Sequence, residues 1–232
     1  MIAVRHARER LRTRIGWLDS WHTFTFEEHI DPRHMGYRAL RVLNEDRVAP
    51  GRGYGSHPRR DLELVSYVIA GTLRHHDSLG TDALVEAGGM QRLSAGTGVL
   101  HGEANGSESE PLHVIHMWIA PARTRLRPSY GHRACPLPSR RGPLTLMASG
   151  DGRDRSLKIH QDVSILSIAL KPRERASYSL AEERHAWVQV VSGSVELNGV
   201  ALAAGDGAAV SDEVDLDFTS ASVSETLLFD LV

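Results

Sequence analysis

The sequence predicts an all-β protein built from two similar β units, with little helix. Apolar and polar residues alternate with period two along several runs, and glycine, proline, Asn and Asp separate these runs. The segment "LNGV" places Asn198-Gly199 between two such runs, which is a strong β-hairpin signal. The run "HPRRDLELVSYVIAGTL" turns at Gly71 and "HAWVQVVSGSVEL" turns at Gly193, so the two halves resemble each other.

Domain boundaries follow from a change in composition near the middle of the chain. The segment "RPSYGHRACPLPSRRGP" is rich in Pro, Arg and Ser, which is typical of a linker. We therefore expect an N-terminal barrel over 1–132, a linker over 133–146 and a C-terminal barrel over 147–232. The first strand is free to pack on the second barrel. The second barrel contains neither an H-x-H nor an H-x-E pattern, so no metal site is expected there.

Composition narrows the class of protein. The 232 residues are 41% hydrophobic with a formal net charge of −2, so neither nucleic acid nor an anionic membrane is an expected partner. No apolar run approaches the roughly 18 to 20 residues that span a bilayer. The N-terminal arginines at 8, 10, 12 and 14 alternate, which predicts the exposed face of an edge strand. The single cysteine, Cys135, excludes an internal disulfide, and a cytoplasmic location is expected.

Two pairs of polar residues could carry chemistry. His57 and Arg59 lie two residues apart and share one face of a strand, and Glu63 has the same parity. His101 and Glu103 form a second pair with the same spacing. If the two segments are neighbouring strands, these side chains converge, and imidazole with carboxylate suits Fe(II), Mn(II), Ni(II) or Zn(II).

Specific motifs extend this interpretation to a family. The segments "WHTFTF", "DPRHMGYRALRVLNEDRVAPG", "HPRRDLELVSYVIAGTLRHHDSLG", "HGEAN", "EPLHVIHMWI" and "HQD" resemble the pirin family of bicupins. The resemblance implies two stacked antiparallel β-barrels of the jelly-roll type. It also implies one metal in the N-terminal barrel, with ligands at His57, position 59, His101 and Glu103. Several bacterial members of the family are quercetin 2,3-dioxygenases, which open a flavonol ring with O2, and other members are described as regulators that bind proteins.

Arg59 departs from the family pattern, which has a histidine there. A guanidinium has no acceptor and stays protonated, so it cannot ligate a metal. His57, His101 and Glu103 remain, and two histidines with a carboxylate suffice in non-haem Fe(II) oxygenases. Repulsion between Arg59 and a divalent ion about 5 Å away would cost several kcal/mol. Arg59 could therefore swing outward past Pro58 and leave a weakly bound metal, or turn inward and pair with Glu103 or Glu63.

Two functions remain open at this point. The first is a metal-dependent dioxygenase of the quercetin 2,3-dioxygenase type, with Fe(II) favoured over Ni, Mn or Zn, and with a flavonol-like substrate and O2. Glu103 would be both ligand and acceptor of the substrate's hydroxyl proton. The alternative is a non-catalytic, metal-poor regulatory protein that binds a protein partner, in which Arg59 replaces the ligand and weakens or abolishes metal binding.

Several other polar residues are expected to be structural. His75 and His76 point to opposite faces of a strand, so at most one of them faces the cavity, and a structural role is expected for both. His116 is expected in the core or behind the ligands. Asn44 and Asp46 are expected to fix a turn.

Overall fold

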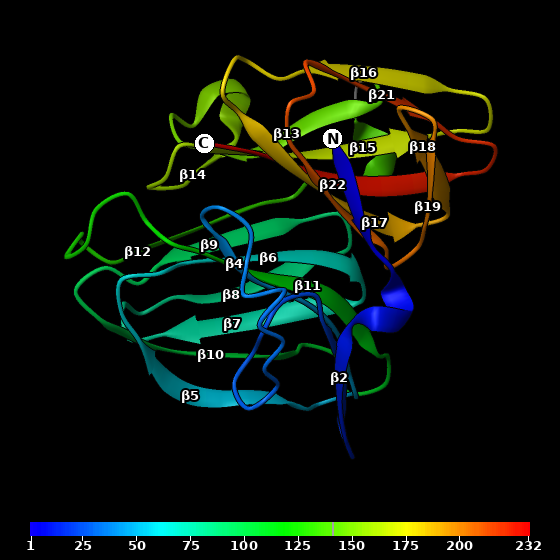
Figure 1. Ribbon diagram of the computed structural model, residues 1–232. Coiled ribbons are helices and arrows are strands. Elements are labelled where there is room, and N and C mark those ends of the chain that lie inside the picture. The colour runs from blue at the N-terminus through cyan, green and yellow to red at the C-terminus, as the bar shows by residue number, and fades with distance from the viewer. Residues whose placement is uncertain (141) are drawn as a thin grey trace. The chain divides into compact units, whose positions relative to one another are not determined.

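The computed structural model describes residues 1–140 and 142–232, and these residues form β-strands with short 3-10 turns at Ala7–Glu9, Leu137–Ser139 and Arg153–Arg155 (Figure 1). The predicted all-β class is therefore confirmed. Contacts divide the chain into two units. The N-terminal unit is Leu11–Pro136 with Leu157–Gln161, and the C-terminal unit is Met1–Arg10, Leu137–Ser156 and Asp162–Val232. Arg141, within the expected linker, lies outside the described residues.

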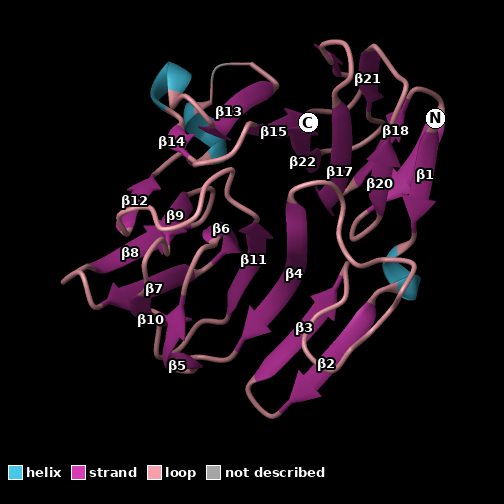
Figure 2. Ribbon diagram, turned by 60° about the vertical axis from the view of Figure 1, so that its left-hand side comes forward, coloured by secondary structure: helices cyan, strands magenta, loops and turns pink. Residues whose placement is uncertain are grey.

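The N-terminal unit consists of two antiparallel sheets. One has the strand order β12-β9-β6-β11-β4-β3-β2 and the other has the order β5-β10-β7-β8. Figure 2 shows β2, β3 and β4 side by side, as their pairing requires. The strands of these sheets are β2 (Leu11–Ile15), β3 (Leu18–His22), β4 (Leu40–Val48), β5 (Gly53–Arg59), β6 (Glu63–Ala70), β7 (Thr72–Asp77), β8 (Asp82–Glu86), β9 (Met90–Ser94), β10 (Val99–Asn105), β11 (Leu112–Ile119) and β12 (Ser129–Arg133). The short strand β14 (Leu157–Lys158) also lies in this unit, outside both of these sheets.

Side chains from both sheets form the core of this unit. Val68 of β6 and Val114 of β11 pack with Leu73 of β7 and Val85 of β8, and all four are buried. The alternation seen in the sequence thus places one face of each strand inward. Each fully buried side chain of this kind contributes roughly 1.5 to 3 kcal/mol, so the core fixes the register of the strands that carry the polar site.

The turn at Gly71 joins β6 of one sheet to β7 of the other. Gly71 has a φ of +81°, and a Cβ there would lie 2.6 Å from the Pro111 carbonyl oxygen. Both facts require glycine, because L side chains rarely adopt this conformation and the backbone leaves no room. The turn predicted from the sequence at this position is present.

The C-terminal unit has a corresponding pair of sheets. One contains β1-β20-β17-β22-β15-β13 in that order and the other contains β16-β21-β18-β19. Leu166, Val188, Phe218 and Leu228 are among the buried residues of its core. The strands are β1 (Ile2–Arg5), β13 (Leu144–Ser149), β15 (Val163–Leu170), β16 (Arg175–Ser179), β17 (His185–Ser192), β18 (Ser194–Leu197), β19 (Val200–Ala203), β20 (Gly207–Val210), β21 (Asp215–Thr219) and β22 (Ser224–Leu231).

The arginine-rich N-terminus is divided between the two units. The first strand, β1, pairs with β20 and so belongs to the C-terminal unit. Arg8 lies in the 3-10 turn that follows, whereas Arg12 and Arg14 lie on the edge strand β2. The expectation of an edge strand is therefore correct for the second pair of arginines only. Within the described residues, no helix has the length and apolar character needed to cross a membrane.

Candidate metal centre

Strand β10 brings the polar residues of the N-terminal unit together, because it lies between β5 and β7 in the smaller sheet. On one side, His101 is directly opposite His57 of β5. On the other side, Glu103 is directly opposite His75 of β7. The convergence of His57, His101 and Glu103 on neighbouring strands follows the sequence interpretation, whereas the position of His75 beside them was not expected.

A β-bulge separates the two site residues of β10. The register with β5 shifts between His101 and Glu103, so Glu103 is opposite Tyr54. Gly53 makes this arrangement feasible, since a Cβ there would lie 2.4 Å from the Glu103 carbonyl oxygen and 2.3 Å from Ala104 Cα. Bulges of this kind commonly occur beside functional sites, where they redirect side chains.

Three buried residues could hold a metal ion. One ligand atom from each of His75, His101 and Glu103 lies within 4.8 Å of the others, and this is the group of three that the described residues offer. Neither ring nitrogen of His101 has a hydrogen-bond partner, and His75 Nδ1 has none. Orphaned buried nitrogens are costly, so two imidazoles and a carboxylate in this state fit a divalent metal.

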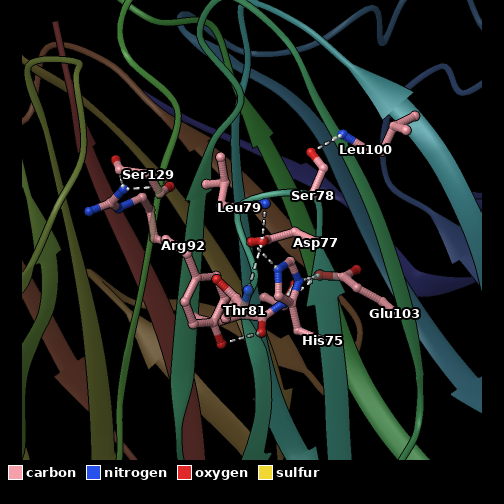
Figure 3. A network of polar contacts seen from close by, with 12 residues as sticks. His75, Asp77, Ser78, Leu79, Thr81, Arg92, Leu100, Glu103 and Ser129 are labelled. Atoms are coloured by element: carbon pink, nitrogen blue, oxygen red, sulfur yellow. Dashed lines mark hydrogen bonds and ion pairs between the residues drawn. The ribbon is translucent and has the colours of Figure 1, made fainter.

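The orientation of His75 is fixed from behind. Its Nε2 lies 3.0 Å from Asp77 Oδ2, and both side chains are fully buried (Figure 3). Asp77 Oδ1 accepts the backbone N–H groups of Leu79 and Thr81 at 2.8 and 3.1 Å. Burial lowers the pKa of His75, but the contacts with Glu103 and Asp77 outweigh burial and raise it. A neutral His75 that donates its Nε2 proton to Asp77 would present the Nδ1 lone pair to a metal, as in many metal-ligating histidines.

His57 is oriented by a backbone carbonyl of its own strand, β5. Its Nδ1 lies 2.8 Å from the Gly55 carbonyl oxygen, which can accept the proton and leave Nε2 as a donor atom for a metal. Its ring centroid lies 4.5 Å from that of His101. His57 is half-buried and outside the group of three, so it adjoins the group without completing it.

Glu103 is surrounded by groups that stabilise its charge. Gln91 Nε2 donates a hydrogen bond to Glu103 Oε1, and His116 Nδ1 lies 3.4 Å from Oε2. His75 Nδ1 is 3.8 Å from Oε1, which is too long for a hydrogen bond but close for a charged contact. Burial alone would raise the pKa of Glu103, but His116 and His75 outweigh it and lower the pKa to about 2. The carboxylate is therefore ionised, as a metal ligand must be.

His101 is held in its neutral form. Burial disfavours the imidazolium and lowers the pKa of His101 to about 4, although the charge of Glu103 opposes the shift. A neutral imidazole is the form that binds metal. His101 and Glu103 thus have the protonation states that ligands require.

A cavity of about 490 Å³ opens beside these residues. His57, His101 and Glu103 line it, whereas the deeply buried His75 does not. Much of the remaining wall is apolar or aromatic, which is typical of a site for a small organic ligand. The apolar and aromatic part consists of Ile15, Trp17, Leu18, Phe26, Leu64 and Trp118.

Arg59 lies in the wall of this cavity, in a position that neither sequence-based alternative described. Its guanidinium carbon is 4.4 Å from the centroid of the Trp118 ring, a cation–π contact. It makes no ion pair with any described residue, so the expected pairing with Glu103 or Glu63 is wrong. It also lines the cavity, so it has not swung outward past Pro58. The carboxylate oxygens of Glu103 are already in contact with other groups, and the face of Trp118 is available instead.

Glu63, expected as an additional pocket residue, does not line this cavity. It is buried in β6, where its Oε2 accepts a hydrogen bond from Ser94 Oγ at 2.8 Å and its Oε1 lies 3.2 Å from His160 Nδ1. A turn at Asp61, which has a φ of 49°, separates β5 from β6. The turn sends Glu63 into the other sheet, so parity along the sequence does not carry across it.

A second row of polar residues behind the site was missed by sequence reasoning. Asp46 belongs to β4 and fixes no turn, which corrects the sequence-based expectation. Its Oδ2 accepts a hydrogen bond from Tyr54 Oη at 2.9 Å and lies 3.5 Å from His116 Nε2. His116 thus bridges Asp46 and Glu103. The only available signal was that Asn44 and Asp46 lie two residues apart and so share one face of a strand-like run.

The fold and this site define a bicupin with a candidate metal centre in its N-terminal unit. Residues 4–119 match the family model described as Pirin, and residues 146–231 match the model of the quercetinase C-terminal cupin domain. The chain therefore belongs to the pirin family.

Individual relatives are similar over the whole chain. A quercetin 2,3-dioxygenase of Escherichia coli is 44% identical over 231 residues, which cover 100% of this chain and 99% of the relative. A pirin-like protein of Caulobacter vibrioides is 38% identical over 216 residues, or 93% of each chain. The crystal structure of the E. coli bacterial pirin YhhW in complex with nickel(II) superposes with a TM-score of 0.95 at 44% identity, covering 100% of this chain and 99% of that one.

Proposed function

We propose that this protein is a metal-dependent dioxygenase of the quercetin 2,3-dioxygenase type, which opens a flavonol-like ring with O2. The observation that carries the proposal is the convergence of His101, Glu103 and two further imidazoles beside a largely apolar cavity of about 490 Å³. A cavity of this size accommodates a small aromatic molecule. The name of the E. coli relative supports this activity, and the nickel(II) complex of YhhW supports a divalent metal in this fold.

The proposed ligands are His57, His101 and Glu103, joined by His75. His75 Nδ1 provides a third imidazole nitrogen on the side opposite His57, which offsets the ligand lost at Arg59. Fe(II) is the favoured ion, because histidines with one carboxylate and open positions are typical of non-haem Fe(II) oxygenases, and Ni(II), Mn(II) and Zn(II) are the alternatives. The bound ion would supply Lewis acidity and a template for the substrate oxygens.

The chain's own residues would position the substrate. The apolar wall holds the aromatic rings and excludes water, which strengthens polar interactions in the cavity. Glu103 is the proposed catalytic carboxylate. It would accept a hydrogen bond from the substrate hydroxyl. Its lowered pKa favours an ionised carboxylate that orients this hydroxyl over one that stores the proton. Asp46 and His116 hold Glu103 in place from behind.

One observation favours a second candidate function. Arg59 places a permanent positive charge in the wall of the cavity, which disfavours a divalent ion. The alternative is therefore a metal-poor pirin-like protein that binds a protein partner and has no catalytic activity.

The two candidates are separated by one experiment. The protein is reconstituted anaerobically with Fe(II) or Ni(II), metal is quantified by elemental analysis, and O2 uptake with quercetin is recorded together with loss of flavonol absorbance. Stoichiometric metal and coupled O2 uptake support the dioxygenase. Protein that retains no metal after incubation with excess Fe(II) or Ni(II), and that consumes no O2 with quercetin, would exclude the dioxygenase and favour the alternative.

A further inference from the structure

Arg59 is a charged residue of the cavity wall that the proposed chemistry does not use. It comes from β5, two residues after His57, and the two side chains share the strand face that borders the cavity. Its Nε is buried without a hydrogen-bond partner. Its guanidinium carbon lies 4.4 Å from the centroid of the Trp118 ring, and this cation–π contact leaves the N–H donors available to a ligand.

No described residue neutralises this cation by direct contact. The nearby acids act on it only through space: Glu27 and Glu103 raise the pKa of Arg59, but burial has the larger effect and lowers it. Glu27 is exposed, and Glu103 is already in contact with Gln91 and His116. A partly desolvated guanidinium with free donors is costly unless a ligand supplies the acceptor.

We infer that the cavity selects a substrate that carries a carboxylate in addition to its vicinal oxygens, and that Arg59 binds this carboxylate. The inference deepens the proposed function, since it concerns the same cavity. A carboxylate matches the guanidinium fork with two parallel hydrogen bonds. The substrate class is therefore an aromatic vicinal-diol or hydroxy-ketone acid, whose ring packs on the apolar wall.

The charges of the cavity agree with this class. Glu103 and Asp46 both contact His116, and a divalent ion, if bound, would balance their charge. Among the described residues that line the cavity, Arg59 is then the one arginine without an ion-pair partner. A ligand would have to supply that partner. A neutral flavonol that covered Arg59 would leave its donors unpaired, whereas an acid of similar shape would satisfy them.

Calorimetry with matched acids and amides tests the inference. The probes are 3,4-dihydroxybenzoate and 2,3-dihydroxybenzoate, each compared with its amide, on Ni(II)-loaded protein under argon. A charge-assisted pair of hydrogen bonds predicts that at least one acid binds about 10 to 100 times more tightly than its amide. In Arg59→Gln this preference falls below about threefold, because the acceptor loses its charged partner. Metal content is measured for every variant.

Arg60→Gln is the matched control, since Arg60 is exposed and its Nε donates to the Thr97 carbonyl oxygen at 3.1 Å. This variant removes the same charge from the neighbouring residue and should keep the acid preference. Acids that bind no better than amides in the unmodified protein overturn the inference, and so does a preference that survives Arg59→Gln. Because the readout is binding without O2, its failure is distinct from failure of the proposed dioxygenase activity.

Discussion

His75 and Glu103 lie directly opposite each other on the paired strands β7 and β10, with Nδ1 and Oε1 3.8 Å apart. Asp77 holds the other nitrogen of His75 at 3.0 Å. A histidine that was expected from the sequence to be structural therefore places a ring nitrogen beside the proposed metal ligands. His75 could therefore supply the imidazole ligand that Arg59 cannot.

Replacement of His75 tests its role as a ligand. We expect His75→Gln to lower Ni(II) or Zn(II) affinity by roughly 10 to 100 times, because one coordinating nitrogen and its carboxylate support are lost. Gln retains a donor for Asp77, which limits the loss of stability. Affinity is measured by competition with a chromophoric chelator.

His76→Gln is the matched control for this experiment. His76 is the next residue on β7, is exposed and lies on the opposite face of the strand. Its replacement should leave metal affinity unchanged. Equal affinities for the two variants and the unmodified protein would assign His75 a purely structural role.

Asp77 should control which nitrogen of His75 carries the proton. Asp77→Asn keeps Oδ1 for the N–H groups of Leu79 and Thr81 but presents an amide donor to His75 Nε2. The proton then moves to Nδ1, the atom facing Glu103, and we expect metal affinity to fall about 10 to 100 times. Nitrogen-15 NMR of the histidine rings reports the tautomer.

An exposed carboxylate on the following strand is the control for this substitution. Asp82 pairs with Arg74 at 2.8 Å on the surface, and Asp82→Asn should change neither tautomer nor affinity. An unchanged His75 tautomer in Asp77→Asn would contradict the proposed support.

Arg59→His should strengthen metal binding. It removes a cation and introduces an imidazole at the position where the family resemblance implies a ligand. Relief of even about 3 kcal/mol of repulsion corresponds to more than a hundredfold in affinity. Chelator competition measures the gain, and Arg60→His serves as the control. A gain of less than about threefold would mean that Arg59, lying on Trp118, does not repel the ion.

In the C-terminal unit, the buried carboxylate of Asp230 should contribute to the free energy of unfolding. Asp230 accepts hydrogen bonds from Arg184 Nε and, at 2.6 Å, from Tyr178 Oη. Asp230→Asn should lower the free energy of unfolding by about 1 to 3 kcal/mol, since it weakens both bonds and leaves Arg184 only the exposed Asp162 as a charged partner.

The midpoint of thermal unfolding is compared between Asp230→Asn and the control Asp215→Asn. The control alters an exposed carboxylate that accepts a hydrogen bond from Ser179 Oγ, and its effect on stability should be nearly neutral. A loss of stability that is the same in both variants would show that burial at Asp230 does not matter.

Much of the fold was predictable because β-structure leaves a local signal. Period-two alternation placed His57 with Arg59, and His101 with Glu103, on common strand faces. Glycine turns such as that at Gly71 marked where strands end. Alternation also predicted that His75 and His76 face opposite ways, and the structure has His75 buried and His76 exposed.

Predictions failed where a turn or a distant strand intervened. Parity grouped Glu63 with His57, but the turn at Asp61 moves Glu63 into another sheet. Asp46 was assigned to a turn, although it lies within β4 and interacts with Tyr54 from β5. Contacts of this kind depend on the register between strands that are far apart in the sequence, which no local pattern encodes.

The amino-acid sequence by itself determined that position 59 carries a permanent cation, because arginine keeps its proton in every environment a protein offers. It also determined which residues share a strand face. Only the tertiary structure decided that Arg59 lies on Trp118 and that His75 adjoins Glu103. The physical reason is that a side chain's partner is set by which groups the packed strands bring near it and by which of those groups are already engaged.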